Sequence, residues 1–419
     1  MEPQPLTMSS NYLAVVRGLR ELHQLTEAGR LDSPEADAVR DATDEPWETL
    51  TDLEKKRIAG LSEDLYSLTE SPRTSIKALN PQAQARLDDI DQARQAGDWD
   101  RAFELLRRWG DYLDPSRLSY LRGATWLGAG DQATAAIFLK HASDLHPADR
   151  LYLSIYLNVL NGVSPIDAHR LASEILQAPD DYQPIVIMNA AHIVINPTKE
   201  LSEAEAVQFY REIIPILEST LYKIERGDDG GVDRISFAMA CTLLGFCHEY
   251  LRESQAALRY YSKGLAANPL DVALLVARGN LLYGSSPGAI EDFQLAIRHK
   301  SPVIWPFYYL AHHNIVTGQF EECRRLCYRA LEMNGSDTIK SELAEWLAIS
   351  EAELGFPPDI VRGSFERSLR FDPSNERARR NLAIFEAATR PIPVNLYETR
   401  TSAAVRASGL SERRLARAA

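Results

Sequence analysis

The residues best suited to chemistry are the thiols and the histidines near two of them. The chain has four cysteines, Cys241, Cys247, Cys323 and Cys327. Cys323 and Cys327 would share one helix face, and His312 and His313 lie on the helix expected before it, a combination that can hold zinc. Small buried thiols also pack well between helices, and the sequence favours this interpretation. We expect no secretion signal, and therefore no structural disulfides.

Two glycine-rich loops imitate ligand-binding motifs. The run Gly128–Ala133 resembles a dinucleotide fingerprint, but such a loop must follow a strand and open a helix. Here it follows an expected helix, so we interpret it as a turn between two helices. The acidic loop Gly227–Gly231, with Asp233 after it, lacks the acidic ladder and terminal Glu of a calcium-binding EF-hand. We interpret it as a solvated loop.

Sequence signatures of catalysis are missing. There is no P-loop, no His-Glu-x-x-His, no nucleophile elbow and no Cys-x-x-Cys, and His248-Glu249 lacks a second His four residues after the first. The prediction is a non-enzymatic protein with no catalytic residues, no cofactor and no metal site.

Net charge and hydropathy argue against further classes of protein. The 419 residues carry a formal net charge of −13, which argues against a general nucleic-acid binder. The most apolar stretch, Ile185–Ile195, is too short to span a bilayer. The N-terminus has no basic region followed by an apolar run, so we expect a cytoplasmic protein. Arginine accounts for 37 of the 46 basic residues, which suggests a GC-rich, bacterial genome.

The elements that must carry these residues are helices. Helix signals recur along the chain, and alternating β-branched runs are nearly absent, so the prediction is an all-α fold. In the first 75 residues Gly29 is placed to end a helix, Ser33-Pro34 to begin one, and Thr51 with Glu54 to form a capping box. Nine acidic residues against one Arg between Leu31 and Glu54 make residues 1–75 an acidic helical N-terminal module.

From about residue 80 a register of small and bulky residues recurs with a period of about 34 residues. A small residue is followed by a second small residue, a bulky one, a third small one and often proline. The clearest unit is Gly245, Ala257, Tyr261, Gly264 and Pro269. Another is Gly123, Ala135, Leu139, Ala142 and Pro147. Helices approach closely only where side chains are small, so this register predicts stacked antiparallel helix hairpins.

In this register the sequence resembles the tetratricopeptide repeat (TPR) family. The resemblance covers about residues 81–390 and is strongest at 238–373. It implies an α-solenoid of antiparallel hairpins forming a right-handed superhelix, with about eight units over 76–390. Residues 150–237 are degenerate, and an arginine-rich tail, 391–419, follows. The tail could lie on the acidic module, an anionic partner or a membrane surface, or be a solvated end.

The resemblance also implies a concave groove lined by the first helix of each unit. The positions that would face it are Arg117, Tyr120, Phe246, Tyr250, Asn280, Tyr283, Trp305, Tyr308, His312, Glu342 and Glu345. Aromatic anchors beside polar groups are typical of peptide-binding surfaces. Packing of the same aromatics on neighbouring helices is the alternative. Glu342 and Glu345 favour a partner with Lys or Arg at that end.

One known sub-pattern of the family is disfavoured. The carboxylate clamp of chaperone-binding members is matched only by Asn280. The other clamp positions are occupied by Val276, Tyr309, Glu342 and Trp346. We therefore expect a scaffold that binds another protein or peptide segment, and no nucleic acid. The alternative is a regulatory or enzyme-associated subunit in which the repeats sense a partner and the N-terminal module transmits the output.

Overall fold

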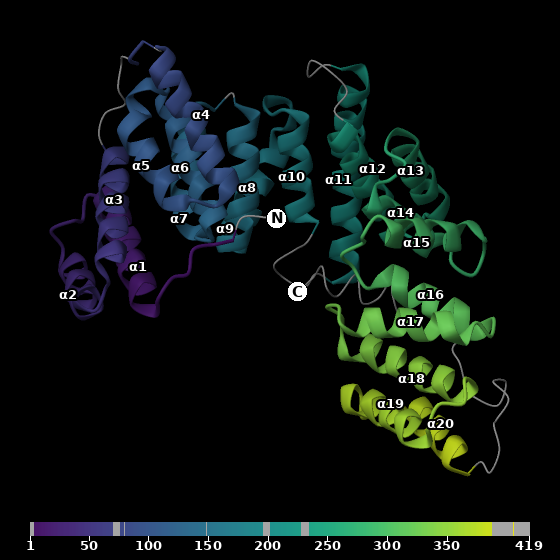
Figure 1. Ribbon diagram of the computed structural model, residues 1–419. Coiled ribbons are helices and arrows are strands. Elements are labelled where there is room, and N and C mark those ends of the chain that lie inside the picture. The colour runs from purple at the N-terminus through teal and green to yellow at the C-terminus, as the bar shows by residue number, and fades with distance from the viewer. Residues whose placement is uncertain are drawn as a thin grey trace. The chain divides into compact units, whose positions relative to one another are not determined.

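The computed structural model describes residues 4–69, 76–78, 80–147, 149–195, 202–227, 234–387 and Val405. In these residues there are 20 α-helices and no β-strand (Figure 1). The predicted all-α fold is confirmed. The chain divides into two compact units, residues 1–175 and 176–419. The expected separator at 72–75, the loop at 228–233 and the tail other than Val405 lie outside the described residues.

Unit 1 contains the N-terminal helices and the first hairpins. Its helices are α1 (Ser10–Glu27), α2 (Pro34–Glu48), α3 (Asp52–Thr69), α4 (Pro81–Ala96), α5 (Trp99–Trp109), α6 (Pro115–Ala129), α7 (Gln132–Leu145), α8 (Arg150–Val163) and α9 (Pro165–Gln177), which crosses the boundary. Helix α6 ends before Gly130, whose φ of 96° favours glycine, and the Asp131 side chain caps α7. The interpretation of Gly128–Ala133 as a turn between two helices is confirmed.

Three local predictions in the N-terminal helices are also confirmed. Helix α1 ends just before Gly29, which has a φ of 68°. The Ser33 hydroxyl accepts a hydrogen bond from the backbone at the start of α2. Thr51 and Glu54 cap the start of α3 reciprocally, with N–H to side-chain distances of 3.3 and 3.0 Å. The helix boundaries therefore follow from local capping chemistry.

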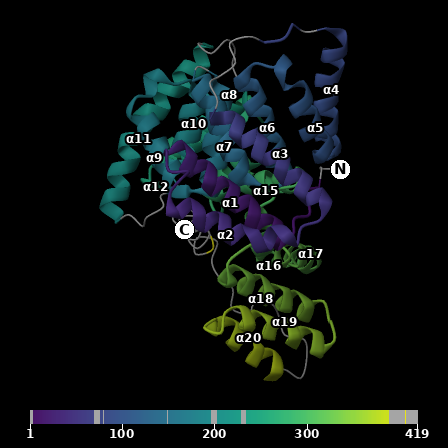
Figure 2. The ribbon, with the colours of Figure 1, turned by 90° about the vertical axis from the view of Figure 1, so that its left-hand side faces the viewer.

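Helices α1 to α3 pack against the first hairpins of unit 1 (Figure 2). The buried Tyr12 and Leu61 belong to the same hydrophobic cluster as Trp126 and Leu139, which come from α6 and α7. Ion pairs reinforce this core, with Arg57 2.7 Å from Asp100, Arg20 2.8 Å from Asp131, and Arg122 2.6 Å from Asp64. Residues 4–69 and the first hairpins thus share one continuous core.

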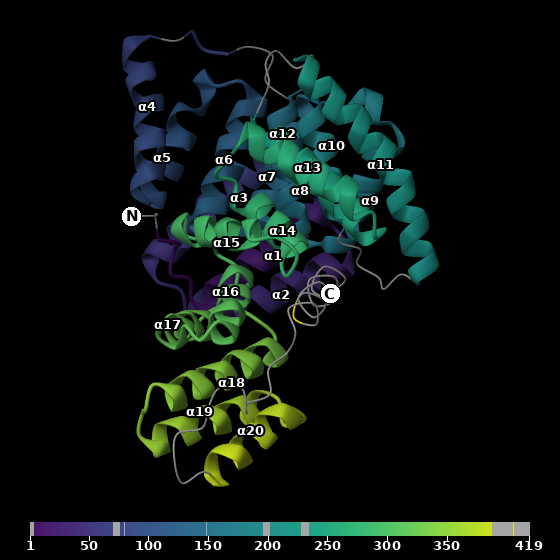
Figure 3. The ribbon, with the colours of Figure 1, turned by 90° about the vertical axis from the view of Figure 1, so that its right-hand side faces the viewer.

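Unit 2 contains the remaining hairpins. Its helices are α10 (Pro184–Val194), α11 (Glu203–Arg226), α12 (Arg234–Tyr250), α13 (Ser254–Ala267), α14 (Val272–Leu282), α15 (Gly288–Arg298), α16 (Trp305–Val316), α17 (Phe320–Leu331), α18 (Asp337–Glu353), α19 (Pro358–Phe371) and α20 (Glu376–Ala387). The pairs α12–α13, α14–α15, α16–α17 and α18–α19 are antiparallel hairpins stacked in chain order (Figure 3). The first helices α12, α14, α16 and α18 also contact one another in that order. The predicted helical-hairpin array is confirmed.

The small and bulky positions of the register meet inside the hairpins. A Cβ atom added at Gly245 would lie 2.2 Å from the Tyr261 ring, and one added at Gly279 would lie 2.7 Å from Phe293. No real Cβ atom fits at such distances, so glycine is what allows the two helices to approach. In α17 the same slots hold Cys323 and Cys327, both fully buried. The packing interpretation of these two thiols is confirmed.

Candidate functional site

The groove positions expected from the sequence are divided between the two units. Arg117 and Tyr120 lie on α6 in unit 1, where Arg117 is exposed and the Tyr120 ring stacks on Tyr152 at 5.1 Å. The other nine lie on four successive first helices of unit 2 or directly after one of them. They are Phe246, Tyr250, Asn280, Tyr283, Trp305, Tyr308, His312, Glu342 and Glu345. The candidate site is therefore the face that α12, α14, α16 and α18 share.

Hydrogen bonds connect these helices one to the next. In α12 the Glu249 carboxylate accepts from the Tyr261 hydroxyl at 2.8 Å and from the Asn280 amide of α14 at 3.3 Å. The Asn280 oxygen accepts a hydrogen bond from the Tyr309 hydroxyl of α16. Tyr283, directly after α14, places its hydroxyl 2.7 Å from His312 Nδ1. Polar groups thus bridge α12, α14 and α16.

The same pattern continues through α18 to the last described helix. The Tyr308 hydroxyl donates to Glu342 of α18. Glu345, one turn further along α18, accepts from Arg377 at 2.6 Å and from Asn381 at 2.7 Å, both on α20. We call these side chains, from Glu249 to Asn381, the inner ladder. The full set is Glu249, Asn280, Tyr283, Tyr308, Tyr309, His312, Glu342, Glu345, Arg377 and Asn381.

Aromatic rings fill the spaces beside the ladder. The Trp346 ring lies 5.0 Å from Tyr308 and 5.3 Å from His312, measured between ring centroids. Trp305 lies edge-on to Tyr308 at 6.1 Å and is only half-buried. Within the described residues, the fully buried indole N–H of Trp346 has no hydrogen-bond partner. The face therefore offers one unused donor inside an aromatic cluster.

The inner helices are buried around most of their circumference. Every residue from 341 to 351 in α18 is buried, as is every residue from 306 to 312 in α16. Of the nine expected groove positions in unit 2, only Tyr250 and Trp305 are half-buried, and the others are buried. An array helix that packs only on neighbouring helices keeps a solvent-facing stripe. On α16 and α18 that stripe is covered.

The two carboxylates expected to attract a basic partner are met by an arginine of this chain. Arg377 approaches Glu345 at 2.6 Å and Glu342 at 3.5 Å. Burial raises the pKa of the Glu345 carboxyl, and the Arg377 guanidinium opposes that rise. Sequence reasoning missed Arg377 because it lies 32 positions after Glu345, on the helix expected only to cap the array. It also missed the ladder roles of Glu249 and Tyr309, although Tyr309 occupies a clamp position.

A zinc site at Cys323 and Cys327 would need two further ligands beside the two thiols. The sulfur atoms of Cys323 and Cys327 lie 3.9 Å apart. His312, the nearby histidine considered as a ligand, instead forms a hydrogen bond with the Tyr283 hydroxyl. Among the described residues, no group of three or more His, Cys, Asp or Glu could hold a metal ion. Burial raises the pKa of Cys241 to about 12, which keeps this thiol protonated and unreactive.

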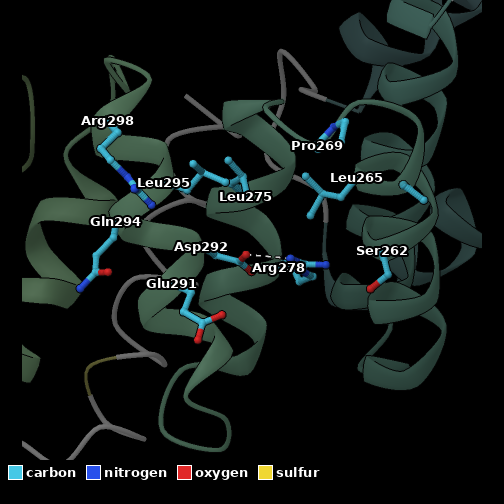
Figure 4. Close-up of a pocket in the computed structure, with 11 residues that line it drawn as sticks. Ser262, Leu265, Pro269, Leu275, Arg278, Glu291, Asp292, Gln294, Leu295 and Arg298 are labelled. Atoms are coloured by element: carbon cyan, nitrogen blue, oxygen red, sulfur yellow. Dashed lines mark hydrogen bonds and ion pairs between the residues drawn. The ribbon is translucent and has the colours of Figure 1, made fainter.

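A pocket of about 650 Å³ lies in unit 2 between α13, α14 and α15 (Figure 4). Two of its charged lining residues pair with each other, since Arg278 donates to both oxygens of Asp292 at 2.7 and 2.8 Å, and Glu291 and Arg298 also line it. This bonding raises the pKa of Arg278. The described residues that line the pocket include no aromatic side chain, so the inner ladder remains the stronger candidate site for a protein or peptide.

Unit 1 has a pocket of its own, of about 430 Å³, lined by α1, α7, α8 and α9. Its lining includes His23, which is buried, and His141, which is half-buried. Burial lowers the pKa of both imidazoles, against an opposing effect of Glu27 on His23 and of Asp144 on His141. Burial therefore favours the neutral form of both histidines.

In the part of the chain that the structure describes, no helix is both long and apolar enough to cross a membrane. Comparisons with protein-family profiles and with curated proteins find no match. Among solved structures, the chain is similar to the TPR domain of P58(IPK), with 16% identity and a TM-score of 0.23 over 76% of this chain and 80% of that one. It is also similar to yeast Tom70, with 11% identity and a TM-score of 0.26 over 80% of this chain and 84% of that one. The helical-hairpin fold itself rests on the contacts within this chain.

Proposed function

We propose that this protein is a non-enzymatic scaffold that binds a protein or peptide segment on the inner face of α12, α14, α16 and α18. The observation that carries the proposal is the inner ladder, which joins four successive helices with aromatic and polar side chains. Aromatic anchors surrounded by polar groups dominate the energetics of protein interfaces. The proposal includes no catalysis and keeps the bacterial, cytoplasmic setting inferred from the sequence.

The chemistry of the face suits an extended segment with a basic residue. The half-buried Trp305 offers an apolar surface beside Tyr308, and the buried Trp346 N–H can donate to a backbone carbonyl of a partner that displaces the cover of α18. Glu342 and Glu345 favour Lys or Arg at the α18 end. A basic partner there shares the two carboxylates with Arg377, so its charge is matched to groups that already bind a guanidinium.

Selection of peptides tests this proposal while the partner is still unidentified. Phage-displayed random peptides are selected on the immobilised full chain, and synthetic copies are measured by fluorescence anisotropy. Trp305→Ala is expected to weaken binding at least about tenfold, the loss of one aromatic anchor. Tyr222→Ala is the matched control, because Tyr222 is 59% exposed on α11. Equal binding to wild type and Trp305→Ala would exclude this face.

A second variant tests the unused donor. Trp346→Phe keeps an aromatic ring beside Tyr308 but removes the indole N–H. We expect selected peptides to bind severalfold more weakly, in line with about 1 kcal/mol for one hydrogen bond. The variant should keep the circular dichroism spectrum of the wild type. Unchanged affinity would mean that the donor does not contact the peptide.

A further inference from the structure

A residue from far beyond the last hairpin lies inside unit 2. Val405 is 0% exposed and belongs to the hydrophobic cluster that also contains Tyr308 and Trp346. It follows the end of α20 at Ala387 by 18 residues. A valine in an arginine-rich, polar stretch is buried only if the folded core receives it. The C-terminal segment therefore contributes at least one anchor to the core of unit 2.

The burial of α16 and α18 requires a further segment that covers them. The partner helices α17 and α19 and the neighbouring first helices contact these two helices. Helices of a hairpin array that have only such neighbours leave one stripe in water. The stripe of α18 includes Glu342, Glu345 and Trp346, which are 4%, 0% and 0% exposed. Helix α20 supplies Arg377 to part of it, and Val405 is a further described residue in the same cluster.

Charge favours the same occupant. Residues 388–419 contain six arginines against two glutamates. The inner ladder carries three carboxylates, on Glu249, Glu342 and Glu345, against the single guanidinium of Arg377, so its formal charge is negative. Opposite charges on two parts of one chain attract most strongly where water is excluded. The segment is therefore opposite in charge to the ladder, and Val405 lies in the hydrophobic cluster that also holds Tyr308 and Tyr309 of the ladder.

Chain length allows the contact. Eighteen residues reach at most about 60 Å when fully extended, more than the length of several stacked helices. Tethering gives the segment an effective concentration on the order of millimolar. Even weak intrinsic affinity would then keep the face occupied for much of the time.

We propose that residues 388–419 bind in cis on the inner face of α14, α16 and α18, with Val405 as the buried anchor. The inference rests on the proposed function, since it names the chain's own basic segment as the occupant of the same face. A partner must displace this segment, so its apparent affinity is reduced by the fraction of molecules in which the face is open. A partner that competes well combines an aliphatic anchor with basic residues.

Hydrogen exchange on the full-length chain tests the contact in cis. Val405→Asp places a charge where the anchor is buried and should release the segment. We expect amide exchange in α16 and α18 to rise at least about tenfold, with α12 and α13 changed much less. Ala419→Asp is the control, because it makes the same charge change at the end of the same segment. Val405→Ala, which adds no charge, should give a smaller rise in the same peptides.

A labelled peptide tests the competition. A fluorescein-labelled synthetic peptide of residues 388–419 should bind the full-length Val405→Asp chain at least about tenfold more tightly than the wild-type chain. The same peptide carrying Val405→Asp should bind neither chain well. Exchange and peptide affinity that are both unchanged by Val405→Asp would overturn the inference.

These outcomes are separable from those of the proposed function. Selected peptides that depend on Trp305 but ignore Val405→Asp would support the binding face and refute its occupation in cis. Faster exchange in Val405→Asp, with no peptide that depends on Trp305, would support the contact in cis and refute the proposed binding function.

Discussion

Arg377 on α20 holds the carboxylate of Glu345 on α18 at 2.6 Å, and the Glu345 side chain is completely buried. The arginine is itself mostly buried, with 15% of its side chain exposed. The pair joins the last described helix to the last hairpin and ends the inner ladder. A buried carboxylate without such a partner would be strongly unfavourable, so α20 is fixed to the array by charge as well as by packing.

Removing the arginine should therefore cost much more than removing a surface ion pair. Arg377→Ala leaves Glu345 buried with only amide partners, and we expect a loss of about 3 kcal/mol in the free energy of unfolding. Adding Glu345→Gln to the Arg377→Ala chain should restore part of the lost free energy of unfolding. Arg362→Ala, whose pair with Glu386 is about half exposed, should cost less than about 1 kcal/mol. Urea unfolding followed by circular dichroism measures all three, and equal losses for Arg377→Ala and Arg362→Ala would contradict the prediction.

Alanine substitutions at two helical glycines separate the effect of close packing on stability from that of helix propensity. Gly245→Ala would place a Cβ atom 2.2 Å from the Tyr261 ring, so we expect a loss of about 1 to 3 kcal/mol from overpacking. Gly363→Ala meets nothing within 4 Å and should stabilise α19 by up to about 1 kcal/mol, because alanine favours a helix. Thermal unfolding measures both. A stabilising Gly245→Ala would show that the hairpin crossing is not tight.

The thiols should be inert in the folded protein. All four cysteines are buried, and burial raises the pKa of Cys241 to about 12 and that of Cys327 well above the usual range. We expect no reaction with Ellman's reagent at pH 8 until urea unfolds the chain, and then four equivalents. EDTA should leave the melting temperature unchanged. A melting temperature that falls with EDTA would indicate a metal site.

Acid should destabilise unit 1 through two histidines. Burial lowers the pKa of His23 and His141 in the folded state, so below about pH 6.5 the unfolded state binds more protons. Stability is therefore lost as the pH falls from 6.5 towards the lowered values. A chain with His23→Gln and His141→Gln should lose less melting temperature between pH 7.5 and 5.5 than the wild type. His299→Gln, at an exposed position, is the control. If it reduced the loss of melting temperature as much as the double variant does, this assignment would be refuted.

The sequence predicted the hairpins because their signals are local. Capping residues such as Ser33, Thr51 and Glu54 act within one helical turn, and the Gly245–Tyr261 contact joins helices separated by a short turn. The same register predicted a row of positions on first helices, nine of which lie on α12, α14, α16 and α18 or directly after one of them. It could not reveal the ladder partners, because the bond from Tyr308 to Glu342 joins residues 34 positions apart.

By itself, then, the sequence determined the all-α class and the hairpin period and predicted a candidate binding face, since all three follow from the spacing of side chains along a helix. Only the tertiary structure decided that this face is covered rather than open. Arg377 and Val405 lie 32 and 60 positions beyond Glu345, and helical periodicity carries no information about what a distant segment covers. Whether Glu342, Glu345 and Trp346 meet solvent or protein depends on such long-range contacts, which the spacing of residues within one helix does not encode.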